Sequence, residues 1–217
     1  MAEHHPGSDL LFSYAAGTLG ESWSLAIATH LALCPHCRDN VALAEELGGT
    51  IMAEVEPEPM APGSWQELVL RLDGREVIPA PLPAMPTASV PPTFPQPLRR
   101  YIGGDARDVA WKRLGGGAYQ FLIPTADSGR ARLLLILAGK PVPRHGHRGR
   151  ELTLVLSGCF SDHLGAFARG DLEDGDEDLV HQPVAGDADD CICLAVTNAP
   201  LRFTSLIHRL SQPLIGI

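Results

Sequence analysis

The sequence predicts a two-domain α + β protein in which a small, metal-bound helical bundle precedes a β-barrel. Three observations support this prediction. Apolar residues recur at helical spacing up to about residue 75, a proline-rich segment follows, and short apolar runs separated by glycines continue beyond it. The expected divisions are a helical domain over residues 1–75, a linker over 76–98 and a barrel over 99–217. A chain of 217 residues has room for two domains of ordinary size.

The helical domain is expected to contain about four helices. Ser8 can cap the first helix, and Pro35 suits the first turn of the third. Asp73-Gly74 can end the fourth, because glycine readily adopts the left-handed conformation that follows many helices. The expected helices cover approximately residues 8–17, 21–33, 35–56 and 64–72.

The linker and the barrel differ sharply in composition from the helical domain. Eight prolines lie between residues 76 and 97, which is typical of an extended, semi-rigid linker without a core of its own. Beyond this segment, runs typical of β-strands are expected at residues 133–138, 151–156, 191–196 and 201–206. Glycines separate these runs and no helical run intervenes, which favours a sandwich or a barrel.

The charge of the chain is concentrated in the helical domain. Of the net charge of −9, residues 1–75 account for −8, because they carry eleven acidic and three basic residues. Such an acidic module is unsuited to phosphate backbones, so direct nucleic-acid binding is not expected. A basic, DNA-binding protein would be a suitable partner. Simple solubility is the alternative meaning of this charge.

Neither a membrane span nor a secretory leader is expected. The chain lacks a run of about 18 apolar residues. Its first residues, MAEHHPGSDLL, lack a basic region followed by an apolar stretch. A cytoplasmic protein is therefore expected. The odd number of cysteines, five, argues against a disulfide framework and favours metal ligands or free thiols.

The first cluster of candidate metal ligands is the H-x3-C-x2-C run formed by His30, Cys34 and Cys37. His30 and Cys34 are four residues apart and share a helix face, and Cys37 returns after a tight turn. Imidazole and thiolate ligands suit zinc, which takes four ligands in structural sites. A redox CxxC motif is the alternative, but the βαβ pattern that usually accompanies it is missing.

The fourth ligand of this zinc site must come from another part of the chain. His4 and His5, ahead of the first expected helix, are the obvious candidates. His36 is weaker, because the neighbour of two ligands often points away from them. A bound metal would contribute directly to the folding of a domain of only about 75 residues.

The second cluster of candidate metal ligands lies in the barrel. His145 and His147 alternate along a strand and point to one face, Glu151 opens the next strand, and His181 follows an acidic loop. Three imidazoles and one carboxylate suit zinc, iron, manganese or nickel, so the ligand types do not select one divalent metal. A barrel without metal, with solvated histidines, is the alternative.

Two cysteines of the barrel form a further candidate site. Cys191 and Cys193 are two residues apart in an expected strand and therefore face the same way. They are candidates for redox sensing, which requires exposure and thiolate character. The alternative is that they are small buried residues of the barrel wall, because free cysteine is among the most buried residue types.

These motifs resemble those of known families. Residues 139–158 read G-x5-H-x-H-x3-E-x6-G and resemble the first motif of the cupin superfamily at every fixed position. The second cupin motif is less regular, since Gly170 lies far before His181 and position 185 is alanine. The H-x3-C-x2-C run resembles the hallmark of zinc-binding anti-sigma domains. Together they resemble anti-sigma factors of the ChrR type, over segments 13–19, 28–31, 145–149, 151–156, 190–194 and 199–203.

The resemblance implies a fold, a partner and two metal sites. The barrel would be a jelly-roll cupin, and the helical domain would bind and inhibit an extracytoplasmic-function sigma factor in a 1:1 complex. Oxidative stress, from singlet oxygen or organic peroxide, would release the sigma factor through the metal-binding cupin domain. The implied Zn²⁺ ligands are His5, His30, Cys34 and Cys37 in the first site and His145, His147, Glu151 and His181 in the second.

Two other functions compete with a regulatory one. A cupin dioxygenase or isomerase with a regulatory N-terminal domain could use three histidines and a carboxylate to bind iron. However, the sequence offers no further acid–base group that can be placed beside that metal, so an enzyme is not expected. A DNA-binding regulator with a zinc finger is disfavoured by the acidic charge of residues 1–75.

Overall fold

The computed structural model describes residues 2–73, 91–200 and 202–203. Its helices are α1 (Ser8–Ala15), α2 (Glu21–Leu31), α3 (Pro35–Ala53), α4 (Ser64–Asp73) and α5 (Gln96–Ile102), with a short 3-10 turn at Ala106–Asp108. The four helices expected in the first 75 residues are therefore present, each within a few residues of its expected ends. Helix α3 begins at Cys34, whose side chain accepts a hydrogen bond from the Cys37 backbone, with Pro35 in the first turn.

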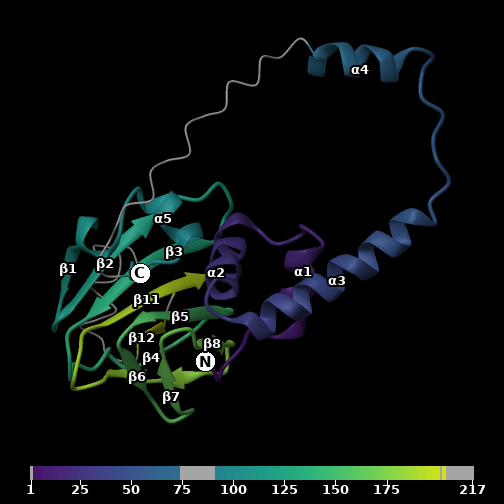
Figure 1. The fold of residues 1–217 in the computed structure, drawn as a ribbon. Coiled ribbons are helices and arrows are strands. Elements are labelled where there is room, and N and C mark those ends of the chain that lie inside the picture. The colour runs from purple at the N-terminus through teal and green to yellow at the C-terminus, as the bar shows by residue number, and fades with distance from the viewer. Residues whose placement is uncertain (1, 74–90, 201, 204–217) are drawn as a thin grey trace.

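The rest of the described chain is a β-barrel made of three antiparallel sheets (Figure 1). The largest sheet has the strand order β1-β2-β3-β11-β5-β8, and the two small sheets have the orders β10-β6-β7 and β12-β4-β9. The strands are β1 (Lys112–Gly115), β2 (Ala118–Ile123), β3 (Arg130–Ile136), β4 (His145–Gly146), β5 (Glu151–Ser157), β6 (Cys159–Ser161), β7 (Ala166–Ala168), β8 (Leu172–Gly175), β9 (Val180–His181), β10 (Val184–Ala185), β11 (Cys191–Thr197) and β12 (Arg202–Phe203). The predicted fold class, helices followed by a barrel, is confirmed.

The central strands of the large sheet are buried on both faces. Along β5, Leu152, Leu154 and Leu156 join one apolar core, whereas Val155 joins a second core on the opposite face. A strand covered on both sides reads as a nearly continuous apolar run, and β11 shows this pattern. One face of the sheet lines the barrel interior, and the other packs against helices.

Helix α2 covers the outer face of the large sheet (Figure 1). Its buried residues Leu25, Ala26 and Ile27 belong to the same core as Leu133 and Leu194 of the central strands. At the N-terminal end of this helix, the Ser22 hydroxyl donates a 2.7 Å hydrogen bond to Asp127. The helical region and the barrel therefore share one hydrophobic core, which the sequence patterns did not predict.

The end of α3 and all of α4 extend away from this core (Figure 1). Buried residues in α3 are confined to its first half, namely Cys37 and Val41. None of the α4 residues whose burial is described is buried. Three of the four expected helices thus pack together, while α4 stands apart from the described body of the protein.

The predicted linker is only partly within the described residues. Its first part falls within residues 74–90, which lie outside them. Its last residues contribute to the fold, because Phe94 and Leu98 are fully buried and α5 begins at Gln96. Most of the strand expected at 201–206 also lies outside the described residues. Among those described, no helix has the length and apolar character needed to cross a bilayer.

Candidate metal centres

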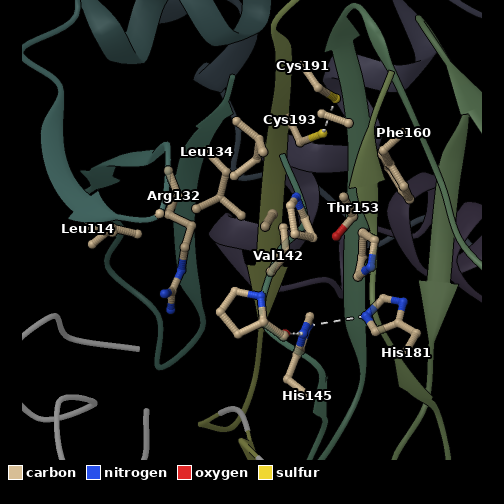
Figure 2. A pocket seen from close by; sticks show the side chains of 18 of the residues that line it. Leu114, Arg132, Leu134, Val142, His145, Thr153, Phe160, His181, Cys191 and Cys193 are labelled. Carbon is tan, nitrogen blue, oxygen red and sulfur yellow. Dashed lines mark hydrogen bonds between the residues drawn. The ribbon is translucent and has the colours of Figure 1, made fainter. Parts of the chain in front are cut away.

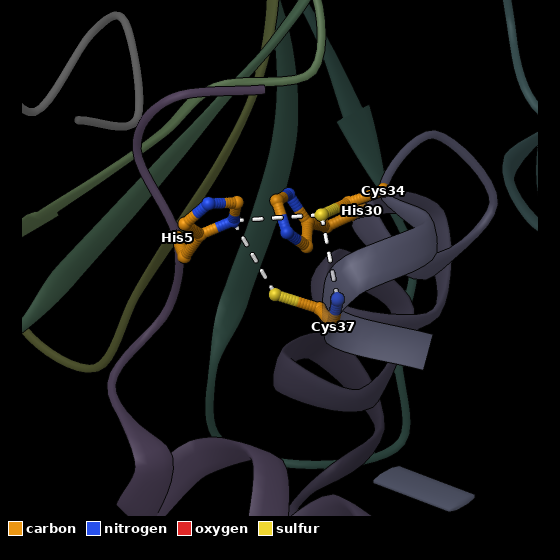
Figure 3. Close-up of side chains that lie close together, drawn as sticks. All are labelled: His5, His30, Cys34 and Cys37. Atoms are coloured by element: carbon orange, nitrogen blue, oxygen red, sulfur yellow. Dashed lines mark hydrogen bonds between the residues drawn. The ribbon is translucent and has the colours of Figure 1, made fainter. Parts of the chain in front are cut away.

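The first candidate centre brings together two histidines and two cysteines from three separate segments (Figure 3). They are His5, His30, Cys34 and Cys37, and one potential ligand atom of each lies within 4.8 Å of the others. The Nδ1 atom of His5 is 3.4 Å from the sulfurs of both Cys34 and Cys37. These are the four residues that the sequence analysis assigned to the N-terminal zinc site.

Local structure explains how three of these side chains converge. His30 lies in the last turn of α2, and the chain then reverses so that Cys34 directly precedes α3. The Cys37 backbone N–H points at the Cys34 sulfur at 3.5 Å, because both lie in the first turn of α3. The N-terminus of a helix carries partial positive charge and therefore favours thiolates.

The structure distinguishes His5 from the two other candidates for the fourth ligand. His4 points away, toward the barrel, where its ring lies 4.4 Å from the ring of Phe167. His36 is exposed and sits 3.4 Å from the side-chain amide of Asn40. Only His5 among these three joins the described group of close ligand atoms.

The segment that carries His5 is fixed to the barrel by backbone hydrogen bonds. The N–H groups of Glu3 and His4 donate to one carboxylate oxygen of Asp171, at 2.6 and 3.0 Å. In addition, the Leu172 N–H donates to the His4 carbonyl at 3.1 Å. Burial by itself raises the pKa of Asp171, but the N–H donors, including that of Ala168, outweigh it and lower the pKa below its ordinary value. The first centre therefore depends on the barrel for one of its four ligands.

The residues of the first centre are chemically suited to a cation. Both ring nitrogens of the buried His30 lack a hydrogen-bond partner among the described residues. Burial lowers the pKa of His30 to about 4, so the ring is neutral and can act as a ligand. Burial also raises the pKa of Cys37 to about 12, with the neighbouring Cys34 adding to this effect. A bound cation would reverse that preference, because coordination deprotonates a thiol.

The second candidate centre lies inside the barrel, where the imidazoles of His145, His147 and His181 converge. Figure 2 shows two of them, His145 and His181. His145 and His181 face each other through their Nε2 atoms at 3.2 Å, and those of His147 and His181 are 3.3 Å apart. All three side chains are buried. His145 is in β4 and pairs directly with His181 of β9, so strand pairing positions two of the three rings.

Hydrogen-bond partners at the Nδ1 atoms orient the rings of His145 and His181. The Nδ1 atom of His145 lies 2.9 Å from the Pro143 carbonyl, which turns Nε2 toward His181 as a potential metal ligand. The Nδ1 atom of His181 lies 2.8 Å from Asp162 and 3.2 Å from Glu173. Burial lowers the pKa of His181, but these two carboxylates and Glu151 outweigh it and raise the pKa above its ordinary value. Asp162 and Glu173 were missed by the sequence analysis, because neither belongs to the histidine motif.

Glu151 occupies a different position from the one expected of a fourth ligand. Its carboxylate does not join the group formed by the three histidines. Instead, one oxygen is 3.5 Å from Nδ1 of His147, and the other accepts a 3.2 Å hydrogen bond from Thr153. Burial raises the pKa of Glu151, yet the nearby His147, His145 and Arg132 together lower it. In this structure Glu151 is thus an anionic neighbour of the three imidazoles.

A cavity of about 290 Å³ inside the barrel is lined by two of the three histidines, His145 and His181. Cys191 and Cys193 line it, and their sulfurs are 3.5 Å apart (Figure 2). Both cysteines are buried, and the neighbouring Cys191 and burial raise the pKa of Cys193 well above its ordinary value. These features disfavour thiolate formation, and a redox role for the pair stays a prediction.

Strand β8 connects the two centres. Its first residue, Leu172, bonds the segment that carries His5, and its next residue, Glu173, contacts the imidazole of His181. A second connection is ionic, because Arg150 contacts both Asp9 of α1 and Asp174 of β8 at 2.5 Å. A displacement of β8 would therefore act on both centres.

Comparisons with known proteins identify the family of the chain. Residues 100–200 match the model of the ChrR cupin-like domain. The anti-sigma-E factor ChrR of Cereibacter sphaeroides is 46% identical over 214 residues, which cover 99% of this chain and 98% of that protein. A crystal structure of Rhodobacter sphaeroides SigE in complex with the anti-sigma ChrR matches with a TM-score of 0.81 and 44% identity, covering 91% of this chain and 100% of that chain. The chain belongs to the ChrR family of anti-sigma factors.

Proposed function

We propose that this protein binds an extracytoplasmic-function sigma factor in a 1:1 complex, keeps it inactive in the cytoplasm, and releases it under oxidative stress. The proposal rests on family membership, since the related ChrR is an anti-sigma-E factor and forms a complex with SigE. It makes the chain a regulator instead of an enzyme. In this proposal the helical domain of residues 1–75 binds the sigma factor, residues 76–98 form the linker, and the barrel of residues 99–217 senses the stress.

The observation that carries the proposal is an exposed apolar stripe on α3 and α4. On α3, Leu43, Leu47 and Ile51 recur every fourth residue on one side of the helix, and Val55 follows just beyond its end; each is between 58% and 66% exposed. On α4, Trp65, Leu68 and Leu72 repeat the pattern and are also exposed. Apolar surface of this extent is characteristic of a site that a protein partner covers.

Zinc in the first centre would hold the binding surface in place. We propose that His5, His30, Cys34 and Cys37 bind Zn²⁺, which would supply a fixed four-ligand link between the N-terminal segment, α2 and α3. The unpartnered nitrogens of His30 and the pair of close sulfurs support this assignment. The start of α3, and hence the direction in which its apolar stripe projects, depends on these ligands.

The barrel would govern release through its own metal. We propose that His145, His147 and His181 hold a divalent ion, with Glu151 as a fourth ligand once the ion draws its carboxylate inward. Imidazoles and thiols are readily oxidised, and His145, His181, Cys191 and Cys193 all line the same cavity. The path from His181 through Glu173 and β8 to the His5 segment supports coupling between an oxidised barrel and the binding surface.

Co-purification with a cognate sigma factor tests the binding part of the proposal. We expect the wild-type chain to retain the sigma factor with two metal ions per chain. Leu47→Asp should weaken the complex by about a hundredfold or more, because it places a charge in the centre of the apolar stripe. The matched control is Ala53→Asp, which adds the same charge to an exposed position away from the stripe. Equal loss of binding in both variants would refute the proposed surface.

A further inference from the structure

The cavity inside the barrel has one apolar end and one polar end (Figure 2). Leu134, Cys191 and Cys193 line the apolar end, while His145 and His181 lie toward the opposite end. The metal-binding proposal uses the histidines but leaves most of the cavity without a role. A concave, largely apolar space with a few converging polar groups is the usual form of a small-molecule site.

A buried arginine at the polar end has no hydrogen-bond or ion-pair partner within the part of the chain that the structure describes. Arg132 of β3 lines the cavity with only 4% of its surface exposed, and its guanidinium extends toward the end where His145 lies (Figure 2). Its Nε atom is buried and lacks a hydrogen-bond partner among the described residues. Burial lowers the pKa of Arg132, whereas attraction to Glu151 raises it without forming an ion-pair contact among those residues. An unpaired buried guanidinium is costly unless a ligand supplies the missing anion.

We propose that the barrel binds a medium-chain monocarboxylate, with its carboxylate on Arg132 and its hydrocarbon chain against Leu134, Cys191 and Cys193. The guanidinium of arginine matches a carboxylate through two parallel hydrogen bonds, which a hydroxyl or an amine cannot reproduce. The acyl chain would occupy the apolar end of the cavity. Carboxylate binding does not depend on the proposed sigma-factor function, and it can be measured in the absence of a partner.

The size and charge of the cavity support this class of ligand. A volume of about 290 Å³ corresponds to roughly ten water-sized groups, which is the number of non-hydrogen atoms in octanoate. Arg132 contributes one positive charge, the carboxylates of Glu151 and Glu173 contribute at most two negative charges, and a divalent ion on the histidines would leave the site electropositive overall. Anionic ligands are therefore favoured over neutral or cationic ligands of the same length.

Calorimetric titration of the purified, full-length, metal-containing protein tests the proposal. We expect octanoate to bind at least about tenfold more tightly than octan-1-ol or octylamine. Arg132→Gln should weaken octanoate binding by about tenfold or more and leave octan-1-ol binding within about twofold. The matched control is Arg130→Gln, which removes the same charge two residues away, at an exposed position of the same strand.

Three outcomes would overturn the proposal. They are the absence of octanoate binding, equal affinity for octanoate and octan-1-ol, and retention of octanoate binding in a folded Arg132→Gln variant. In the last case the carboxylate would sit on the metal, and chelation would abolish binding. If Arg132→Gln does not fold, Ala195→Leu serves instead, because Ala195 pairs with Arg132 across the sheet and lines the cavity. It should weaken octanoate and octan-1-ol alike, and unchanged octanoate binding would place the ligand elsewhere.

Discussion

The two candidate metal centres differ in ligand chemistry, in surroundings and in the structure that supports them. The first combines two cysteines with two histidines, and its ligands come from the N-terminal segment, α2 and the start of α3. The second consists of three imidazoles inside a preformed barrel, beside a cavity of about 290 Å³. A complete set of four protein ligands is typical of structural zinc, whereas three ligands beside open space are typical of a reactive or responsive site.

This difference indicates that the first centre stabilises the fold, whereas the second serves the response to oxidative stress. The first centre ties the start of α3 to α2 and to the N-terminal segment, and α3 has no buried residue beyond Val41, so loss of the centre should release the binding surface. The second is built on paired strands that remain paired without it, since β4 bonds both β9 and β12. Loss of the second centre should therefore alter the response while leaving the overall fold intact.

The largest expected effect comes from removing a thiolate of the first centre. Cys37→Ser should lose one metal ion per chain and abolish sigma-factor retention, because structural zinc contributes on the order of 10 kcal/mol to the folding of small domains. Metal analysis and co-purification would measure both effects. The control is Cys159→Ser, since Cys159 is exposed and lies outside this centre. A Cys37→Ser variant with full metal content and partner binding would remove the distinction between the centres.

A smaller and more selective effect is expected in the barrel. His147→Ala should lose the barrel metal and keep sigma-factor affinity within about threefold, while reducing release by organic peroxide or singlet oxygen. A reporter gene controlled by the sigma factor would measure release. The matched control is His163→Ala, because His163 is an exposed histidine of the barrel, in the turn between β6 and β7. Normal induction in His147→Ala would exclude the barrel as the sensor.

Asp171→Asn tests the connection between the centres. The change should cost about 1–3 kcal/mol, because the neutral amide accepts the N–H groups of Glu3 and His4 less strongly. Faster loss of metal from the first centre to a chelator would reveal the effect on the His5 segment. The control is Asp189→Asn, an exposed aspartate in the barrel. Identical chelation rates in both variants would contradict the coupling.

The same carboxylate predicts a pH dependence. The pKa of Asp171 is lowered in the folded protein relative to its ordinary value of 3.8. Its contribution to stability should therefore be complete above that value and disappear as the pH falls through the lower, folded-state pKa. Acid unfolding of wild type and Asp171→Asn should converge at the lowest pH. A constant difference between their unfolding free energies would contradict this linkage.

The smallest effect concerns long-range charge. Glu45→Lys combined with Glu46→Lys should weaken sigma-factor binding by only about three- to tenfold, because exposed charges contribute little individually. Measurement at two salt concentrations should show that this difference shrinks as ionic strength rises. The control is Glu177→Lys on the barrel, where the expected change is within about twofold. Binding that is insensitive to both salt and charge reversal would make the acidic charge a matter of solubility alone.

Much of this architecture could be predicted from local sequence patterns. Apolar spacing and turn residues indicated the four N-terminal helices, and the spacing of His30, Cys34 and Cys37 indicated one metal centre because its ligands are close in sequence. The choice between His4 and His5 could not be made in the same way. It depends on Phe167 and Asp171, which lie more than 160 residues further along the chain.

Contacts between residues far apart in the sequence also account for two features that local patterns did not predict, the carboxylates at His181 and the shared core. Asp162 follows β6 and Glu173 lies in β8, and the packing of different sheets brings both to His181 of β9, so no motif connects them. The shared core had a local signal in β5, where Leu152, Leu154 and Leu156 are apolar on the side that a free-standing barrel would expose to water. Polar residues at these outward-facing positions would have indicated a barrel with a solvated outer face.

The position of α2 on the outer face of the large sheet has a consequence for dissecting this protein. A fragment consisting of the barrel alone would expose Leu133, Leu152 and Leu194, which are fully buried in the complete chain. Such a fragment should aggregate or dimerise, and the separated N-terminal fragment should lose the support that orients His5. Studies of either half in isolation would report on truncation artefacts, so single substitutions in the intact protein are the appropriate tools.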